Sequence, residues 1–101
     1  MKWYHVYIMS NKGRTVFYTG VTNNVARRRE EHREEGDEDG FCGKYNIVDV
    51  IYIEDFRYIT EAIRREKRLK RWRRSEKLNL IKSVNPTLAS LEPPYFTLSS
   101  P

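Results

Sequence analysis

The sequence contains two short apolar segments, Val6-Tyr7-Ile8 and Phe17-Tyr18-Thr19-Gly20, and each carries one central tyrosine. Residues 10–15, which join them, are rich in the Ser, Asn and Gly of tight turns. The pattern therefore predicts two antiparallel strands joined as a hairpin, with the two tyrosines close in space. Strand alternation places Tyr7 on the same face as His5, which predicts that this face is not entirely core.

The rest of the chain predicts one more strand and three helices. An asparagine cap begins a helix that runs to about Glu35, and residues 47–53 form a β-branched strand that is central in the sheet or covered on both faces. Thr60 opens the next helix, and Ser75 opens a last one that ends before Asn85-Pro86. The expected fold is α+β, a three-stranded antiparallel sheet flanked by helices in the order β-β-α-β-α-α.

Length and composition indicate a small single-domain protein. The 101 residues are enough for one domain, expected over residues 1–86, followed by a proline-containing tail over residues 87–101. The one cysteine, Cys42, excludes an internal disulfide framework and a structural zinc site. The sequence shows neither a signal segment nor an apolar run of membrane-spanning length, so we expect a cytoplasmic protein with no membrane partner. The oligomeric state is left open.

The net charge of +5 is unevenly distributed along the chain. Residues 64–82 contain ten Lys and Arg against two Glu, whereas seven acids lie within residues 30–39. A cationic segment attracts phosphate polyanions and releases their counterions, which makes nucleic acid the leading partner. A solvated helix face explains the charge equally well, and an acidic lipid surface is a weaker third alternative. The cations expected to contact nucleic acid are Lys44, Arg65, Arg68, Arg71, Arg73 and Arg74.

The helix after the hairpin is predicted to direct two polar side chains toward the sheet. Arg28 and His32 recur with Val25 at helical spacing, so a cation and an imidazole share a face with an apolar residue. Arg27 and Arg29 are assigned to ordinary ion pairs with nearby acids.

A carboxylate is predicted to face inward from the following helix. Glu66 falls within an apolar stripe formed by Ile59, Ala62, Ile63 and Leu69. A buried carboxylate without a partner is costly, so something must satisfy it. A salt bridge, a metal ion and a catalytic network are the alternatives.

Together these residues resemble the GIY-YIG nuclease family over about residues 4–86. The resemblance rests on the order and spacing of Tyr7, Tyr18 with Gly20, Arg28, His32 and Glu66. It is strongest with small single-domain bacterial members, which carry segments similar to Tyr18 to Asn23, Arg65-Glu66-Lys67 and Asn85-Pro86. The chain departs from the motifs in two places. In the first motif, His5-Val6 precedes Tyr7 and the family's glycine is missing. The second motif reads Tyr-Thr-Gly rather than Tyr-Ile-Gly.

The resemblance implies a metal-dependent endonuclease that hydrolyses phosphodiester bonds in DNA, with RNA as a further candidate substrate. By the family pattern, Tyr7 and Tyr18 position or deprotonate the attacking water, Arg28 contacts the scissile phosphate and His32 assists proton transfer. Glu66 matches the metal-binding glutamate, and Mg²⁺ or Mn²⁺ is the implied cofactor. Asn85 is a candidate match for the late asparagine of the family. Two other classes remain as alternatives: a catalytically silent nucleic-acid-binding module that uses the basic segment 64–82, and a protein-interaction module.

Overall fold

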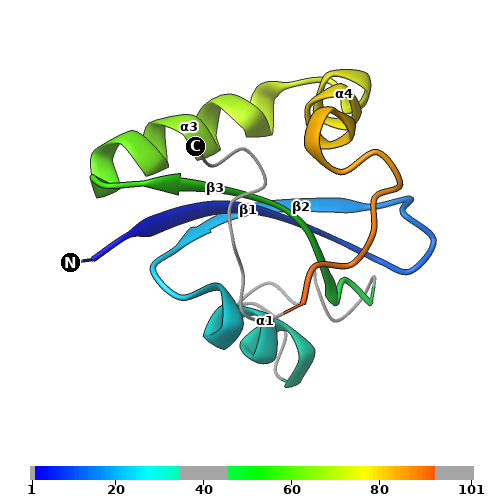
Figure 1. Cartoon of the computed structure of the whole chain (residues 1–101), viewed down its shortest axis with the longest axis horizontal. Coiled ribbons are helices and arrows are strands. Elements are labelled where there is room, and N and C mark those ends of the chain that lie inside the picture. Colours follow the sequence, from blue (N-terminus) through cyan, green and yellow to red (C-terminus); the bar gives the residue numbers. More distant parts are fainter. Residues whose placement is uncertain (1, 35–45, 93–101) are drawn as a thin grey trace.

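A computed structural model describes residues 2–34 and 46–92, without the side chains of residues 32–34. The chain forms one sheet with helices on both of its faces (Figure 1). The elements are β1 (Tyr4–Ser10), β2 (Phe17–Thr22), α1 (Val25–Glu34), β3 (Asp49–Phe56), α3 (Ile59–Arg71) and α4 (Arg74–Val84). This is the predicted order, so the α+β fold with three antiparallel strands is confirmed.

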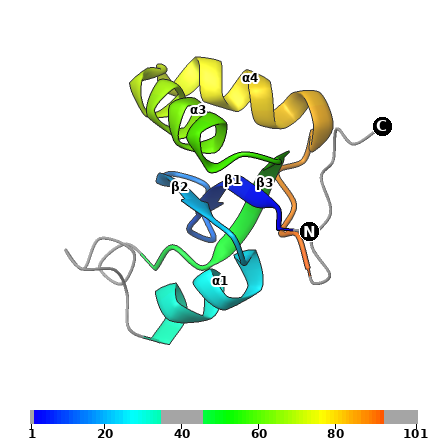
Figure 2. The same cartoon turned by 90° about the vertical axis from the view of Figure 1, so that its left-hand side faces the viewer.

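The molecule has three layers, with the sheet in the middle. Helices α3 and α4 cover one face and α1 covers the other, as the two perpendicular views show (Figure 1, Figure 2). On the α1 face the core contains Tyr7 and Met9 of β1 with Val25 of α1. On the opposite face Val6 of β1 packs with Ala62 and Leu69 of α3. The alternation of side chains along β1 thus supplies both cores.

The strand order is β2-β1-β3, and both pairings are antiparallel. The predicted hairpin is confirmed, with Tyr7 opposite Gly20 and Met9 opposite Tyr18. The third strand lies at an edge of the sheet and is not central, but it is buried from Asp49 through Ile53 because layers cover both its faces. It also extends to Phe56, three residues beyond the predicted end, because these residues continue to pair with β1.

The prediction that the face of Tyr7 is not entirely core is confirmed, although Tyr7 itself is buried, with an exposed fraction of 1%. The polar character of this face is confined to the end of the strand. There His5 Nδ1 lies 2.6 Å from Asp55 Oδ1, and both side chains are partly exposed. Alternation identified the face, but burial also depends on how much of it α1 covers.

The outer edge of β3 is covered by the segment that follows α4. Leu91 N donates to Val50 O at 2.7 Å, and Asn85 Nδ2 donates to Ile51 O at 2.8 Å. Leu88 and Leu91 also pack against the two cores. Residues 87–92, which the sequence assigned to the tail, therefore contact the domain, while Tyr95 and the other tail residues from 93 onward lie outside the described residues.

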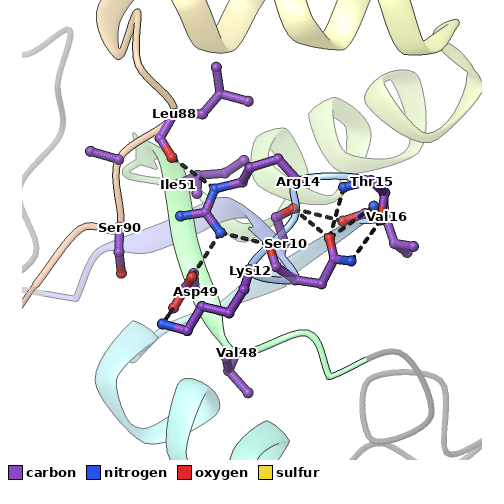
Figure 3. A network of polar contacts seen from close by, with 12 residues as sticks. Ser10, Lys12, Arg14, Thr15, Val16, Val48, Asp49, Ile51, Leu88 and Ser90 are labelled. Atoms are coloured by element: carbon purple, nitrogen blue, oxygen red, sulfur yellow. Dashed lines mark hydrogen bonds and ion pairs between the residues drawn. The ribbon is translucent and has the colours of Figure 1, made fainter.

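A buried carboxylate of β3 holds the hairpin turn, and an arginine of that turn also contacts the covering segment (Figure 3). Asp49 is 2% exposed and accepts from Arg14 Nη1 at 2.8 Å and from Lys12 Nζ at 3.3 Å. Arg14 also donates from Nε to Leu88 O at 2.9 Å. The positive φ of 56° at Arg14 directs this side chain back from the turn toward β3. One arginine thus links three segments that are distant in the sequence.

Candidate active site

The first motif tyrosine lies against the backbone of the second motif. Tyr7 is paired with Gly20 across the strands, and a β-carbon built on Gly20 would lie 2.6 Å from Tyr7 Cζ. Only glycine leaves room for the phenol ring at this position. The ring centroids of Tyr7 and Tyr18 are 6.3 Å apart, with an interplanar angle of 34°. The predicted proximity of the two tyrosines is confirmed.

Helix α1 directs Arg28 toward these two rings. The helix begins with an asparagine cap, in which Asn24 Oδ1 accepts from Arg27 N at 3.0 Å, and Val25 anchors its first turn in the core. Arg28 Nη1 donates to Glu31 Oε1 at 3.1 Å, and the phenols of Tyr7 and Tyr18 also interact with the guanidinium. Although burial lowers the pKa of Arg28, its interactions with Glu31 and with the two phenols raise it above its ordinary value, so the side chain stays cationic.

The arginines on either side of Arg28 have other partners. Arg27 Nε pairs with Glu31 at 3.8 Å, as predicted from their spacing. Arg29 lies 3.9 Å from Glu30 and also donates from Nε to Val48 O at 3.1 Å, a contact that the sequence did not indicate. Glu31 is nearer to Arg28, at 3.1 Å from Nη1.

A groove runs beside Arg28 at the edge of β2. Its lining combines Arg27, Arg28 and Glu31 of α1 with Val21, Thr22 and Asn23 at the end of β2 and with Tyr4, Ile59 and Ile63, and its volume is about 430 Å³. Ile59 and Ile63 are 46% and 37% exposed, although the sequence assigned both to a buried stripe. They form an apolar wall for the groove instead. The groove therefore joins the two helices that carry the predicted site residues.

Glu66 lies one turn beyond this wall. Ile59, Ile63 and Glu66 recur at four- and three-residue spacing, so they project from one side of α3. The Glu66 side chain is 15% exposed, and its Oε2 lies 3.6 Å from Nζ of the exposed Lys70. The prediction of an inward-facing carboxylate is supported by this burial. Of the alternatives for its partner, the salt bridge is the one seen in the described part of the chain.

A buried hydroxyl lies on the face of β2 that α3 covers. Thr19 is 4% exposed, and within the described residues its Oγ1 has no hydrogen-bond partner. Thr19 is on the same face of β2 as Phe17 and Val21, which pack on the cores of the α3 and α4 face. Nothing in the sequence indicated this buried hydroxyl except its place in the Tyr-Thr-Gly motif.

The donor set on these elements fits a loosely held divalent cation. Within residues 2–34 and 46–92, no three His, Cys, Asp or Glu side chains cluster as a metal cage. Mg²⁺ is commonly held by one or two carboxylates, several waters and a substrate phosphate, so one half-buried glutamate such as Glu66 is compatible with it. The backbone of His32 lies in α1 one turn after Arg28, and its side chain is outside the described part, as is all of Lys44.

Two of the predicted nucleic-acid contacts are engaged within the protein. Arg65 donates from Nε and Nη2 to the Glu54 carboxylate, each at 2.9 Å, and its guanidinium lies 5.2 Å from the Trp72 ring centroid. Arg74 donates to the carbonyl oxygens of Arg14 and Thr15 and lies over the Phe17 ring. Arg65 is half-buried, whereas Arg74 is exposed like Arg68, Arg71 and Arg73 but is held by these contacts to the hairpin. Charge in the sequence did not distinguish these two groups.

Asn85 has a structural environment. It is 7% exposed, and its Nδ2 donates to Ile51 O and Ala89 O while its Oδ1 accepts from Ala89 N. The amide is therefore occupied by the backbone at the edge of β3. We leave Asn85 out of the candidate site.

Comparison with known proteins relates this geometry to a family. A family model of the GIY-YIG catalytic domain matches residues 3–79. The chain belongs to the GIY-YIG family. The matched range includes both motif tyrosines, Arg28 and Glu66, so the resemblance found in the sequence is confirmed.

Three relatives of the chain are each named as a UPF0213 protein. A UPF0213 protein of Oceanobacillus iheyensis is 37% identical over 82 residues, covering 77% of this chain and 88% of its own. A UPF0213 protein of Halobacterium salinarum is 36% identical over 74 residues, and the match covers 73% of this chain and 94% of that relative. The solution NMR structure of a UPF0213 protein of Bacillus halodurans has a TM-score of 0.51 at 28% identity, covering 82% of this chain and 86% of that one. The GIY-YIG family is generally one of endonucleases.

Proposed function

We propose that this protein is a divalent-metal-dependent endonuclease that hydrolyses phosphodiester bonds in DNA. The observation that carries the proposal is the position of Arg28 in the groove at the edge of β2, next to the paired rings of Tyr7 and Tyr18, whose phenols interact with its guanidinium. A permanent cation thus lines a groove with an apolar wall and has two phenols behind it, which suits the binding of a phosphodiester and the transfer of a proton beside it.

Each side chain has a distinct part in this proposal. Arg28 binds the scissile phosphate and stabilises the charge that develops on its oxygens. Tyr18 is half-buried and can contact the attacking water, whereas Tyr7 is 1% exposed and holds Arg28 in place. His32, one helical turn after Arg28, is proposed to assist proton transfer.

In the described part of the chain, no helix has the length and apolar character to cross a bilayer.

The proposed cofactor is Mg²⁺ or Mn²⁺, held by Glu66. The half-buried position of this carboxylate and its place one helical turn beyond the apolar wall of the groove support the assignment. When bound, the ion would supply Lewis-acid neutralisation of phosphoryl charge. Lys70 is 52% exposed, so its ion pair with Glu66 is weak and can be exchanged at little cost.

The test is cleavage of a panel of single-stranded, duplex and branched DNA and RNA with Mg²⁺ or Mn²⁺. Wild type is compared with Glu66→Gln and with Glu61→Gln, which removes an exposed carboxylate from the same helix. We expect wild type and Glu61→Gln to cut, and Glu66→Gln to lose at least about 100-fold in rate. Cleavage by Glu66→Gln at the wild-type rate would contradict the metal assignment. Binding of the panel without cleavage by any variant would make the protein a nucleic-acid-binding module.

A further inference from the structure

Four cations form a continuous surface on the solvent side of α3, which we call the α3 basic face: Arg64, Lys67, Arg68 and Arg71. All four side chains are exposed, and they recur at three- and four-residue spacing. With Trp72 they line a hollow of about 480 Å³. This set differs from the cations expected from the sequence, because Arg65 points to the other flank of the helix and pairs with Glu54.

The charges of the α3 basic face are not neutralised within the described part of the chain. The ion pairs found there for α3 are those of Arg65 with Glu54 and of Lys70 with Glu66, and none involves the four cations of this face. Like charges at three- and four-residue spacing repel one another, so the arrangement is unfavourable for the isolated helix. A polyanionic partner would remove this repulsion.

Trp72 gives the hollow a rigid floor. It packs against the core formed by Val6, Ala62 and Leu69, and the Arg65 guanidinium stacks on its ring. The aliphatic stems of the neighbouring arginines and lysines can lie on such a surface while their charged ends extend into solvent. The cations are therefore presented from a fixed base.

The α3 basic face continues from the groove of the candidate site. Ile63, which lines that groove with Arg28, is followed four residues later by Lys67 on the adjoining part of the helix surface. A strand bound at Arg28 and leaving over Ile63 would meet Lys67 and Arg71 next. From Arg64 to Arg71 the helix rises by about 10 Å, which is long enough to contact several phosphates.

We propose that the α3 basic face binds the phosphate backbone of the nucleic acid beyond the cleavage point. The inference rests on the proposed function, from which it takes DNA as the partner and Arg28 as the place of cleavage. It assigns to Lys67, Arg68 and Arg71 a share of affinity without sequence preference, because contacts to phosphate carry no base information. The site at Arg28 would then act on a strand that is held at a second place.

The experiment measures binding of labelled duplex DNA in the presence of a chelator, so that cleavage cannot interfere. Salt is varied from about 50 to 200 mM, and the slope of log K against log salt is determined for Lys67→Gln, Arg71→Gln and Lys82→Gln. Lys82→Gln removes one exposed charge from α4 and is the matched control. Two duplexes are used, one short enough to fill only the groove and one that extends beyond it.

On the long duplex we expect Lys67→Gln and Arg71→Gln each to reduce the slope by about 1, while Lys82→Gln leaves it unchanged. On the short duplex all three should match wild type. Wild-type slopes for Lys67→Gln and Arg71→Gln on the long duplex would overturn the inference. Binding to vesicles of acidic phospholipid, with none to DNA, would overturn it too. If the slopes change but no nucleic acid is cut under any condition, the binding face stands and the proposed enzyme does not.

Discussion

The ring of Tyr7 lies against Gly20 at the position where β1 and β2 pair, in space that a β-carbon would fill. Gly20→Ala is therefore expected to displace the ring and to disturb the interaction of its phenol with Arg28. Overpacking of a buried position costs about 1–3 kcal/mol. We expect a lower free energy of unfolding in urea, together with loss of DNA cleavage by the fraction that remains folded.

Gly13→Ala is the control for this substitution. The atom nearest to a β-carbon at Gly13 is Thr15 Cγ2 at 3.8 Å, an ordinary contact. This variant should retain wild-type stability within about 0.5 kcal/mol and full activity. Equal effects of the two substitutions would show that glycine is needed at position 20 for its backbone freedom and not for the space beside Tyr7.

Arg28→Lys is expected to abolish most cleavage although it conserves the charge. A lysine has no planar fork and cannot bind a phosphate through two parallel N–H donors. We expect a fall in kcat of about 100-fold or more, with a much smaller change in DNA affinity measured without metal. Arg27→Lys is the matched control, because Arg27 is exposed and its pair with Glu31 is long at 3.8 Å. If Arg28→Lys weakens binding as much as it slows cleavage, Arg28 contributes to ground-state affinity alone.

Asp49 should make the stability of the fold depend on pH under acidic conditions. Burial raises the pKa of Asp49, but the hydrogen bonds from Arg14 and Lys12 lower it by more than burial raises it. The pKa in the folded state is therefore below the ordinary value of about 3.9. Because the pKa is lower in the folded state, ionised Asp49 stabilises the fold at any pH above its pKa in the unfolded chain. This contribution disappears as the pH falls through its pKa in the folded state. The loss is therefore expected below about pH 4.

The measurement is the free energy of unfolding in urea between about pH 7 and pH 2 for wild type and Asp49→Asn. The variant should be less stable at neutral pH by about 1.5–3 kcal/mol, because Arg14 loses its anionic partner, and its stability should fall less on acidification. Glu61→Gln, at an exposed carboxylate, should follow the wild-type curve. Parallel curves for wild type and Asp49→Asn would contradict the assignment.

Asn85→Ala separates a structural role from a catalytic one. The substitution leaves the carbonyl oxygens of Ile51 and Ala89 without their amide donor, and we expect a destabilisation of about 1–3 kcal/mol. The kcat of the folded fraction should match wild type. Asn79→Ala, at an exposed position in α4, should change neither quantity. A large fall in kcat with unchanged stability would return Asn85 to the active site.

Local patterns predicted the framework of this fold because they depend on neighbours in sequence. The turn between the tyrosines, the Asn24 cap and the alternation along β1 each involve residues a few positions apart. Arg28 and Glu66 were identified as inward-facing from helical spacing alone, and their partial burial agrees with this. The order of these elements was then enough to indicate the family.

What the sequence could not give was the choice of distant partners. Arg65 and Arg68 look equivalent in a run of cations, yet Arg65 pairs with Glu54 on β3 while Arg68 stays exposed. Arg74 is held by the carbonyl oxygen of Thr15, 59 residues earlier. The exposure of Ile63 likewise follows from the groove between α1 and α3, which no single helix pattern contains.

The segment that covers β3 makes the sheet asymmetric. Asn85 and Leu91 occupy the outer edge of β3, whereas β2 has β1 as its single strand neighbour among the described residues. An unpaired strand edge is a template for pairing with another chain. A second copy that added a strand along β2 would cover the groove beside Arg28. Self-association through the sheet and access of a substrate to the groove are therefore mutually exclusive.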